Sequence, residues 1–450
     1  MSHLSVAKFG GTSVANYPAM QSCANIVIAD PNTRVVVLSA SAGVTNLLVA
    51  LANGCEEPER NKLLNEVRQI QENILTALKD DSRVRPKIEA LLANITSLAE
   101  AANLATSLAL TDELISHGEM MSSLIFVEVL HELQIEATWL DVRTIVATNS
   151  HFGKAAPNDE QTRQNCDNLL KPLIERGELV ITQGFIGRDE QGKTTTLGRG
   201  GSDYSAALLA EVLNAQDVLI WTDVAGIYTT DPRIVPNAQR IDTMSFSEAA
   251  EMATFGAKVL HPATLLPAVR SNIPVYVGSS KAPQEGGTWV TRNPQPRPTF
   301  RAIALRRDQT LLTLSSLNML HAQGFLANIF TILAKHKISV DTITTSEVSV
   351  ALTLDKTGSA SSGASLLSEE LLRELSEFCT VKVDVGLSLI ALIGNELHTA
   401  SGVAKRIFET LDAYNIRMIS YGASTNNICL LADSDKADDI VRVLHRSLFE

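Results

Sequence analysis

Short buried-strand patterns alternate with helical patterns through the N-terminal part of the sequence, and this alternation constrains the fold more than any other feature. Strands joined by helices favour a mostly parallel sheet with helices on both faces. The predicted strands are Leu4–Phe9, Arg34–Ala40, Glu136–Asp141, Leu179–Gly187, Asp217–Asp223 and Ile273–Val277. The sequence therefore predicts an α/β domain whose sheet is sandwiched by helices.

One long segment between these strands carries apolar residues at helical spacing and no strand pattern. Its spacing is set by Leu63, Val67, Ile70, Ile74 and Leu78, which recur at intervals typical of one helix face. We expect a helical insertion at about 56–110.

The C-terminal part begins after a segment rich in proline and glycine, residues 282–301, which favours neither helix nor strand. Beyond it the sequence repeats: Gly324 and Phe330 recur as Gly402 and Phe408, in each case 78 residues later. A repeat of this length indicates two copies of one small α+β unit, each too small to fold easily alone. The expected domains are an α/β domain, 1–296, and a C-terminal region, 297–450, with modules at about 310–385 and 386–450 whose boundaries can interleave.

A glycine-rich segment, residues 194–203, reads TTTLGRGGSD and precedes an apolar helical pattern. Glycines let the backbone approach a ligand closely, and the free amides at a helix start attract anions. Ser202 or Asp203 is expected to cap the helix, and Arg199 offers a planar fork for a carboxylate or phosphate. The segment thus predicts an anion-binding site.

A second motif just upstream is misleading. Residues 187–194 read GRDEQGKT and fit the GxxxxGK[ST] pattern of a phosphate-binding loop. Such a loop must open a helix, but the following residues are β-branched and strand-like. We interpret the segment as a hairpin with its tip at 189–192.

Five segments, taken together, resemble the aspartokinases, which belong to the amino acid kinase family. They are residues 8–13, 37–46, 194–203, 221–233 and 255–262, which read KFGGTS, VLSASAGVTN, TTTLGRGGSD, WTDVAGIYTTDPR and FGAKVLHP. The resemblance covers essentially the whole chain and implies two C-terminal ACT-type modules, which in this family bind amino acids and pair across subunits.

The resemblance implies transfer of the γ-phosphoryl group of ATP, with Mg²⁺, to the β-carboxylate of L-aspartate. Since that carboxylate is already ionised at neutral pH, the site needs cations, amides and hydroxyls rather than a general base. By resemblance the catalytic residues are Lys8 and Asp203, and no residue is expected to ligate a metal. The implied substrate-binding residues are Ser39, Thr45, Glu119, Arg199, Gly200, Gly201 and Ser202, with Arg199 on the α-carboxylate and Glu119 on the ammonium. The implied nucleotide-binding residues are Lys8, Gly10, Gly11, Thr222, Asp223, Tyr228, Arg233 and Lys258.

The repeat itself suggests the regulatory ligand. At the 78-residue offset Asp341 and Glu347 correspond to Ile419 and Thr425, so only the first copy has two carboxylates. Two anionic side chains suit L-lysine, which carries two ammonium groups. Residues 343–349, which read ITTSEVS, also resemble the corresponding segment of lysine-sensitive, monofunctional aspartokinases. The expected lysine-binding residues are Met319, Gly324, Phe325, Leu326, Val340, Asp341, Ser346 and Glu347.

Composition narrows the class further. A net charge of −12 without a basic stripe argues against nucleic acid as a partner, and no run approaches a membrane span. Five scattered cysteines indicate reduced thiols, so we expect a cytoplasmic protein. The resemblance implies a homodimer, or a tetramer, that pairs through its regulatory modules. The alternatives are another amino acid kinase, such as one acting on glutamate, and a catalytically inactive amino-acid sensor.

Overall fold

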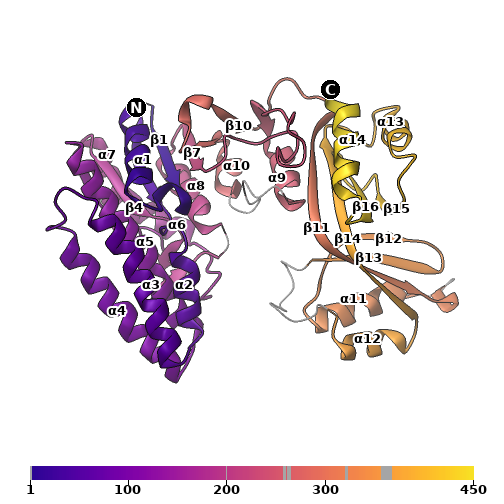
Figure 1. Ribbon diagram of the computed structural model, residues 1–450, viewed down its shortest axis with the longest axis horizontal. Coiled ribbons are helices and arrows are strands. Elements are labelled where there is room, and N and C mark those ends of the chain that lie inside the picture. Colours follow the sequence, from indigo (N-terminus) through magenta and orange to yellow (C-terminus); the bar gives the residue numbers. More distant parts are fainter. Residues whose placement is uncertain (1–2, 199, 257–259, 261–264, 320–322, 356–366) are drawn as a thin grey trace. The chain divides into compact units, whose positions relative to one another are not determined.

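The computed structural model describes residues 3–198, 200–256, 260, 265–319, 323–355 and 367–450 (Figure 1). The chain forms two compact units. Unit 1 comprises residues 1–227, 240–249 and 259–295, and unit 2 comprises residues 228–239, 250–258 and 296–450. Two short segments of the expected catalytic domain therefore fold with the C-terminal region.

Unit 1 is built on an eight-stranded sheet with the order β3-β4-β2-β1-β7-β9-β10-β8. All neighbours are parallel except β9 and β10, which are antiparallel. The strands are β1 (Ser5–Phe9), β2 (Thr33–Leu38), β3 (Ala137–Trp139), β4 (Leu179–Gln183), β7 (Asp217–Thr222), β8 (Thr243–Ser245), β9 (Val275–Ser279) and β10 (Gly287–Thr291). The mostly parallel sheet predicted from the sequence is confirmed.

The central strands of this sheet are mostly apolar and buried, because helices cover both faces. In β1 and β4 every residue is buried, as expected for strands without a solvent-facing side. The helices of this unit are α1 (Tyr17–Ala29), α2 (Val44–Ala52), α3 (Glu57–Leu75), α4 (Arg85–Leu104), α5 (Leu108–Glu132), α6 (Asp159–Asn165), α7 (Lys171–Glu175), α8 (Gly201–Leu213) and α10 (Leu266–Ser271), and α9 (Phe246–Thr254) begins in it.

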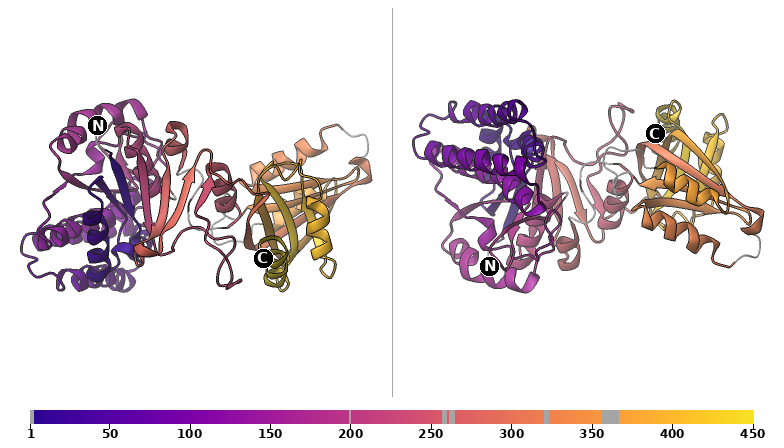
Figure 2. Two further views of the ribbon diagram at one scale, coloured as in Figure 1. Left: turned by 90° about the horizontal axis from the view of Figure 1, so that it is seen from above. Right: turned by 90° about the horizontal axis from the view of Figure 1, so that it is seen from below.

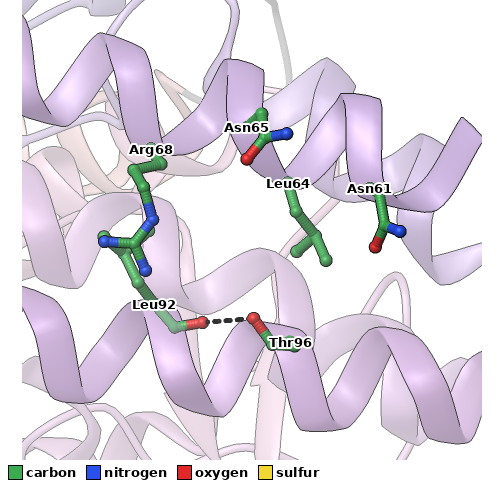
Figure 3. Close-up of a pocket in the computed structure, with 6 residues that line it drawn as sticks. All are labelled: Asn61, Leu64, Asn65, Arg68, Leu92 and Thr96. Atoms are coloured by element: carbon green, nitrogen blue, oxygen red, sulfur yellow. Dashed lines mark hydrogen bonds between the residues drawn. The ribbon is translucent and has the colours of Figure 1, made fainter. Parts of the chain in front are cut away.

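Helices α3 and α4 occupy the segment expected to be a helical insertion, and they pack on α2 and α5 (Figure 1). Their apolar faces join the main core through Val67, Ile74, Ile88 and Ile95. A groove of about 350 Å³ lies between α3 and α4, lined by Asn61, Leu64, Asn65, Arg68, Leu92 and Thr96 (Figure 3). None of the residues expected for catalysis lines this groove, and its Thr96 hydroxyl donates to the Leu92 carbonyl at 3.0 Å.

Unit 2 contains a six-stranded antiparallel sheet with the order β12-β13-β11-β14-β16-β15 (Figure 2). Its strands are β11 (Phe300–Ser315), β12 (Ser339–Thr345), β13 (Ser349–Asp355), β14 (Thr380–Gly394), β15 (Ile416–Ser420) and β16 (Asn427–Asp433). Its helices are α11 (Phe325–Lys335), α12 (Glu369–Ser376), α13 (Val403–Thr410) and α14 (Ala437–Phe449).

The two repeats share this sheet, since β11 and β14 both run through two separate cores. Leu312 and Leu314 of β11 pack with α11 and α12, whereas Phe300 and Ile303 of the same strand pack with α13 and α14. The repeat is visible in the backbone: Gly324 and Gly402 each precede a helix with φ of 84° and 82°, a conformation that favours glycine. Strand β11 therefore contributes to the cores of both repeats.

Candidate active site

The carboxyl end of β1 carries the lysine expected to be catalytic. Lys8 Nζ lies 2.6 Å from Asp203 Oδ1, in the first turn of α8, and the two side chains are only 11% and 15% exposed. Residues far apart in the sequence are thus brought together by the parallel sheet, which places the ends of β1 and the start of α8 at one edge. A nearly buried ammonium beside a glycine-rich loop is suited to neutralising a phosphoryl group.

The loops after β1 and β2 pack closely, and this requires small residues. A Cβ on Gly11 would lie 2.8 Å from the carbonyl oxygen of Ala40. The Ala42 amide donates to the Gly11 carbonyl at 3.0 Å, and the Gly10 amide donates to Trp221 at 3.1 Å. Gly11 therefore allows the β1 and β2 loops to meet, with Ser39 at the end of β2.

Two helices that follow this edge begin at glycines in the left-handed region. Gly200 precedes α8 with φ 75° and Gly43 precedes α2 with φ 88°, and within the described residues neither helix start has a side-chain cap. The expectation that Ser202 or Asp203 caps α8 is wrong, because the cap position is Gly200 and Asp203 pairs with Lys8. The first amide of each helix is already engaged, since Gly201 donates to Gly198 and Val44 donates to Ser41, both at 3.0 Å. The next amides, of Ser202 and Thr45, are placed to meet an anion.

Glu119, on α5, is a buried carboxylate with an unused oxygen. Its Oε1 accepts a hydrogen bond from the Ala40 amide at 3.2 Å, while Oε2 is buried without a hydrogen-bond partner among the residues that the structure describes. Burial raises the pKa of Glu119 from 4.5 to about 8. Gly118 makes the approach possible, since a Cβ there would lie 2.7 Å from that of Ala40. A group of this kind is suited to receive a cation such as an ammonium.

The residues expected to bind nucleotide are distributed over both units. Thr222 ends β7 and Asp223 follows it, exposed, in unit 1, and the Thr222 hydroxyl donates to Asp223 at 3.2 Å. Tyr228 and Arg233 belong to unit 2, where Arg233 pairs with Asp231 at 2.6 Å. Arg199 and Lys258, two further predicted site residues, lie outside the described residues.

The misleading motif at 187–194 is a hairpin, as predicted. Strands β5 (Ile186–Arg188) and β6 (Thr194–Thr196) pair antiparallel, with Gly187 opposite Thr195. Lys193 is exposed before β6, so the structure offers no helix start at which this lysine could hold a phosphate.

The residues expected to bind lysine lie around α11 and β12 of unit 2. The Asp341 carboxylate on β12 pairs with Arg306 at 2.8 Å and is 12% exposed. Ser346 and Glu347 are exposed in the turn between β12 and β13. Asp341 therefore lies within β12, and Glu347 lies in the turn that follows this strand.

The other expected lysine-binding residues differ in burial. Phe325 is buried in the α11 core, whereas Leu326 is exposed. Met319 and Val340 are half-buried, and Gly324 precedes α11. These residues all belong to the first repeat, as expected from its sequence.

Asp112 is a buried polar residue that sequence analysis did not single out. It is fully buried on α5 and accepts four hydrogen-bond contacts from Gly153 and Thr196. Asp112 is one of four carboxylates in residues 108–130, so the local sequence gave no signal that distinguished it.

No helix in the part of the chain that the structure describes is long and apolar enough to cross a membrane. Within the same residues, no group of three or more histidine, cysteine, aspartate or glutamate side chains could hold a metal ion.

Comparison with known proteins agrees with this site. Residues 3–279 match the model of the amino acid kinase family, and residues 390–448 match that of the ACT domain. The chain belongs to the amino acid kinase family.

Within that family it is similar to lysine-sensitive aspartokinase 3 of Escherichia coli, with 61% identity over the full length of both chains. It is also similar to two crystal structures of E. coli aspartokinase III, with full coverage of both chains. One holds aspartate and ADP (R-state; 61% identity, TM-score 0.89) and the other lysine and aspartate (T-state; 60% identity, TM-score 0.88). The recognition of an aspartokinase from the sequence is confirmed.

Proposed function

We infer that this chain is an aspartate kinase, which transfers the γ-phosphoryl group of ATP to the β-carboxylate of L-aspartate and is inhibited by L-lysine. The observation that carries this function is the Lys8–Asp203 ion pair beside the glycine loops and uncapped helix starts. It is joined by full-length similarity to a lysine-sensitive aspartokinase.

The chemistry expected of the site is the neutralisation of charge between two anions. Lys8 would reach the transferring phosphoryl oxygens, and the Gly11 amide would contact the phosphates. Gly10 would let the backbone approach the nucleotide closely, since its own amide donates to the Trp221 carbonyl at 3.1 Å. Asp203 holds the Lys8 ammonium in place, because its carboxylate lies within ion-pair distance. No general base is required, since the acceptor carboxylate is ionised at neutral pH.

We assign the acceptor to the space between α5 and the start of α8. Glu119 would take the ammonium of aspartate with its unused Oε2, and Arg199 would take the α-carboxylate. Ser39, Thr45, Gly200, Gly201 and Ser202 would complete the binding of substrate with hydroxyls and amides.

The nucleotide would be held by Thr222, Asp223, Tyr228, Arg233 and Lys258. Mg²⁺ would arrive with ATP and would supply positive charge that offsets the charge of the phosphates. The described residues include no cluster of side chains that could hold the ion by themselves, and Asp203 is paired with Lys8. The phosphates of ATP would therefore supply the oxygen ligands that the protein does not.

The function is tested by ADP release from purified protein with L-aspartate and with L-glutamate. We expect turnover with aspartate and little with glutamate. Preference for glutamate would support a different amino acid kinase, and absence of turnover with either would support an inactive sensor.

For regulation, we propose that lysine binds the first repeat with its ammonium groups near Asp341 and Glu347, and with contacts to Met319, Gly324, Phe325, Leu326, Val340 and Ser346. Since Glu347 lies in an exposed turn, a second copy of the chain would cover this site when lysine is bound. The Asp341 carboxylate would have to exchange its Arg306 partner. This arrangement favours a homodimer formed through the regulatory modules, and two dimers could form a tetramer.

Unit 2 includes two segments from the N-terminal part of the chain, residues 228–239 and 250–258. They could link lysine binding in the regulatory modules to the nucleotide site. Thr229 lies next to Tyr228, and its hydroxyl contacts the buried His445 of α14 at 2.9 Å. Glu251 of α9 accepts hydrogen bonds from Ser424 and Asn427 at 2.9 and 2.7 Å. A shift of the modules on lysine binding would thus act on the segment that carries Tyr228 and Arg233.

Glu251→Gln tests this route, because it removes the charge that holds α9 to the second module. We expect weaker inhibition by lysine with uninhibited kcat close to wild type. Unchanged inhibition would exclude Glu251 from the coupling.

We propose a catalytic domain at 1–296, with its helical insertion at about 56–110, and a regulatory region at 297–450 with modules at about 310–385 and 386–450. A cytoplasmic location is favoured because all five cysteines are free thiols, as is usual in a reducing compartment.

A further inference from the structure

Strand β6 leads into the start of α8, and each of its three threonines is held by a different part of unit 1. Thr194 accepts a hydrogen bond from Arg143 at 3.0 Å, and Thr195 shares one with Thr148 at 2.6 Å. The third, Thr196, donates its hydroxyl to Asp112 on α5. All three threonines are buried.

Asp112 joins three separate segments. Its Oδ1 accepts from the Thr196 hydroxyl at 2.8 Å, and its Oδ2 accepts from the Thr196 amide at 2.9 Å. Both oxygens also lie within 3.1 Å of the Gly153 amide nitrogen. The Ala155 amide in turn donates to the Thr196 carbonyl at 2.8 Å. The carboxylate therefore holds α5, the loop at 153–155 and the end of β6 in one arrangement.

Burying the Asp112 carboxylate lowers the stability of the folded protein relative to an apolar side chain at the same position. Asp112 is fully buried, and burial raises its pKa against the lowering effect of its hydrogen bonds. A buried carboxylate held only by amides and a hydroxyl is expensive unless its geometry is needed.

The geometry links the two elements that carry the groups assigned to the acceptor. Asp112 and Glu119 are seven residues apart, so they share one face of α5 at a rise of about 10.5 Å. Two residues after Thr196 comes Gly198, whose carbonyl accepts from the Gly201 amide at 3.0 Å as α8 begins. Asp112 thus ties the helix of Glu119 to the chain that opens α8.

We propose that Asp112 is a positioning residue for aspartate, which sets the spacing between Glu119 and the first turn of α8. This inference rests on the proposed assignment of those groups to the acceptor. Asp112 itself touches no substrate. It acts through Thr196 and Gly153.

The test is the steady-state kinetics of Asp112→Asn. In this variant the NH₂ group of the side chain must face a backbone N–H, because both oxygens of Asp112 accept hydrogen bonds from backbone N–H groups. We expect the KM for aspartate to rise about tenfold while the KM for ATP stays within about twofold of wild type. The matched control is Glu211→Gln, since Glu211 is another buried carboxylate of unit 1 and contacts Arg270 and Ser271. It should lower thermal stability and leave both KM values unchanged.

Thr196 provides a milder pair of variants in case Asp112→Asn does not fold. Thr196→Val removes the hydroxyl contact and keeps the backbone one, so the KM for aspartate should rise about threefold or more, and Thr196→Ser should restore it. Equal rises in both KM values, no change in either, or a rise with Glu211→Gln would overturn the proposal. Failure of the wild-type protein to release ADP with aspartate would instead contradict the proposed function.

Discussion

Replacing Glu119 with glutamine should change how the stability of the ligand-free protein depends on pH. Burial raises the pKa of this carboxyl from 4.5 to about 8 in the folded state. Between these pH values the folded protein therefore binds more protons than the unfolded chain, and stability must fall as pH rises through this window. The glutamine variant has no proton to lose and should lack this fall.

The size of the effect follows from the pKa. A difference of about 3.5 pH units corresponds to a ceiling of about 5 kcal/mol. Relaxation around the ionised group and entry of water reduce this, so we expect about 2–3 kcal/mol. For a domain the size of unit 1 this is a shift in Tm of roughly 5–10 °C.

The assay is thermal unfolding of wild type and Glu119→Gln at pH 5.5 and 8.5, without ligands. At pH 5.5 the two should differ little, because a protonated carboxyl and an amide have nearly the same shape. At pH 8.5 the variant should be the more stable protein. Glu190→Gln, at the exposed tip of the hairpin, is the control and should behave alike at both pH values. If the Tm difference between wild type and Glu119→Gln does not change with pH, the carboxyl is not held protonated and the reasoning fails.

Three further predictions concern the assigned residues. Lys8→Ala should lower kcat far more than it raises the KM for aspartate, because the ammonium meets charge that develops during phosphoryl transfer. Arg199→Ala should instead act mainly on the KM for aspartate. The reverse pattern in steady-state kinetics would mean that the two roles are exchanged. Lys193→Ala should leave ATP affinity and turnover nearly unchanged, since this lysine is exposed beside the hairpin tip, and a large loss in an ATP-binding assay would contradict the hairpin interpretation. Glu347→Ala should weaken lysine binding about tenfold, by the loss of one charge-assisted contact, with uninhibited kcat unchanged. Thr425→Ala, its equivalent in the second repeat, should have much less effect, and calorimetry showing equal losses in both variants would place the lysine site elsewhere.

Much of the site could be read from local sequence because its chemistry depends on local backbone. Lys8, Gly10 and Gly11 follow one strand and Gly200 to Asp203 open one helix, and glycines at helix starts leave a clear pattern. Even here the sequence misjudged the cap of α8, because the Lys8–Asp203 contact competes with capping and only the fold brings Lys8 near. Asp112 was missed for the same reason, as its partners lie 41 and 84 residues away in the sequence.

The sequence by itself determined the alternation of strands and helices, the repeat of 78 residues and the glycine-rich loops, because these depend on periodicity and on residues with special backbone freedom. Only the tertiary structure decided that residues 228–239 and 250–258 fold with unit 2, and that β11 serves both repeats. It alone showed that Asp341 faces Arg306 and that Glu119 keeps an unused oxygen. The physical reason is that burial and pairing are set by segments distant in the chain, whose approach no local pattern encodes.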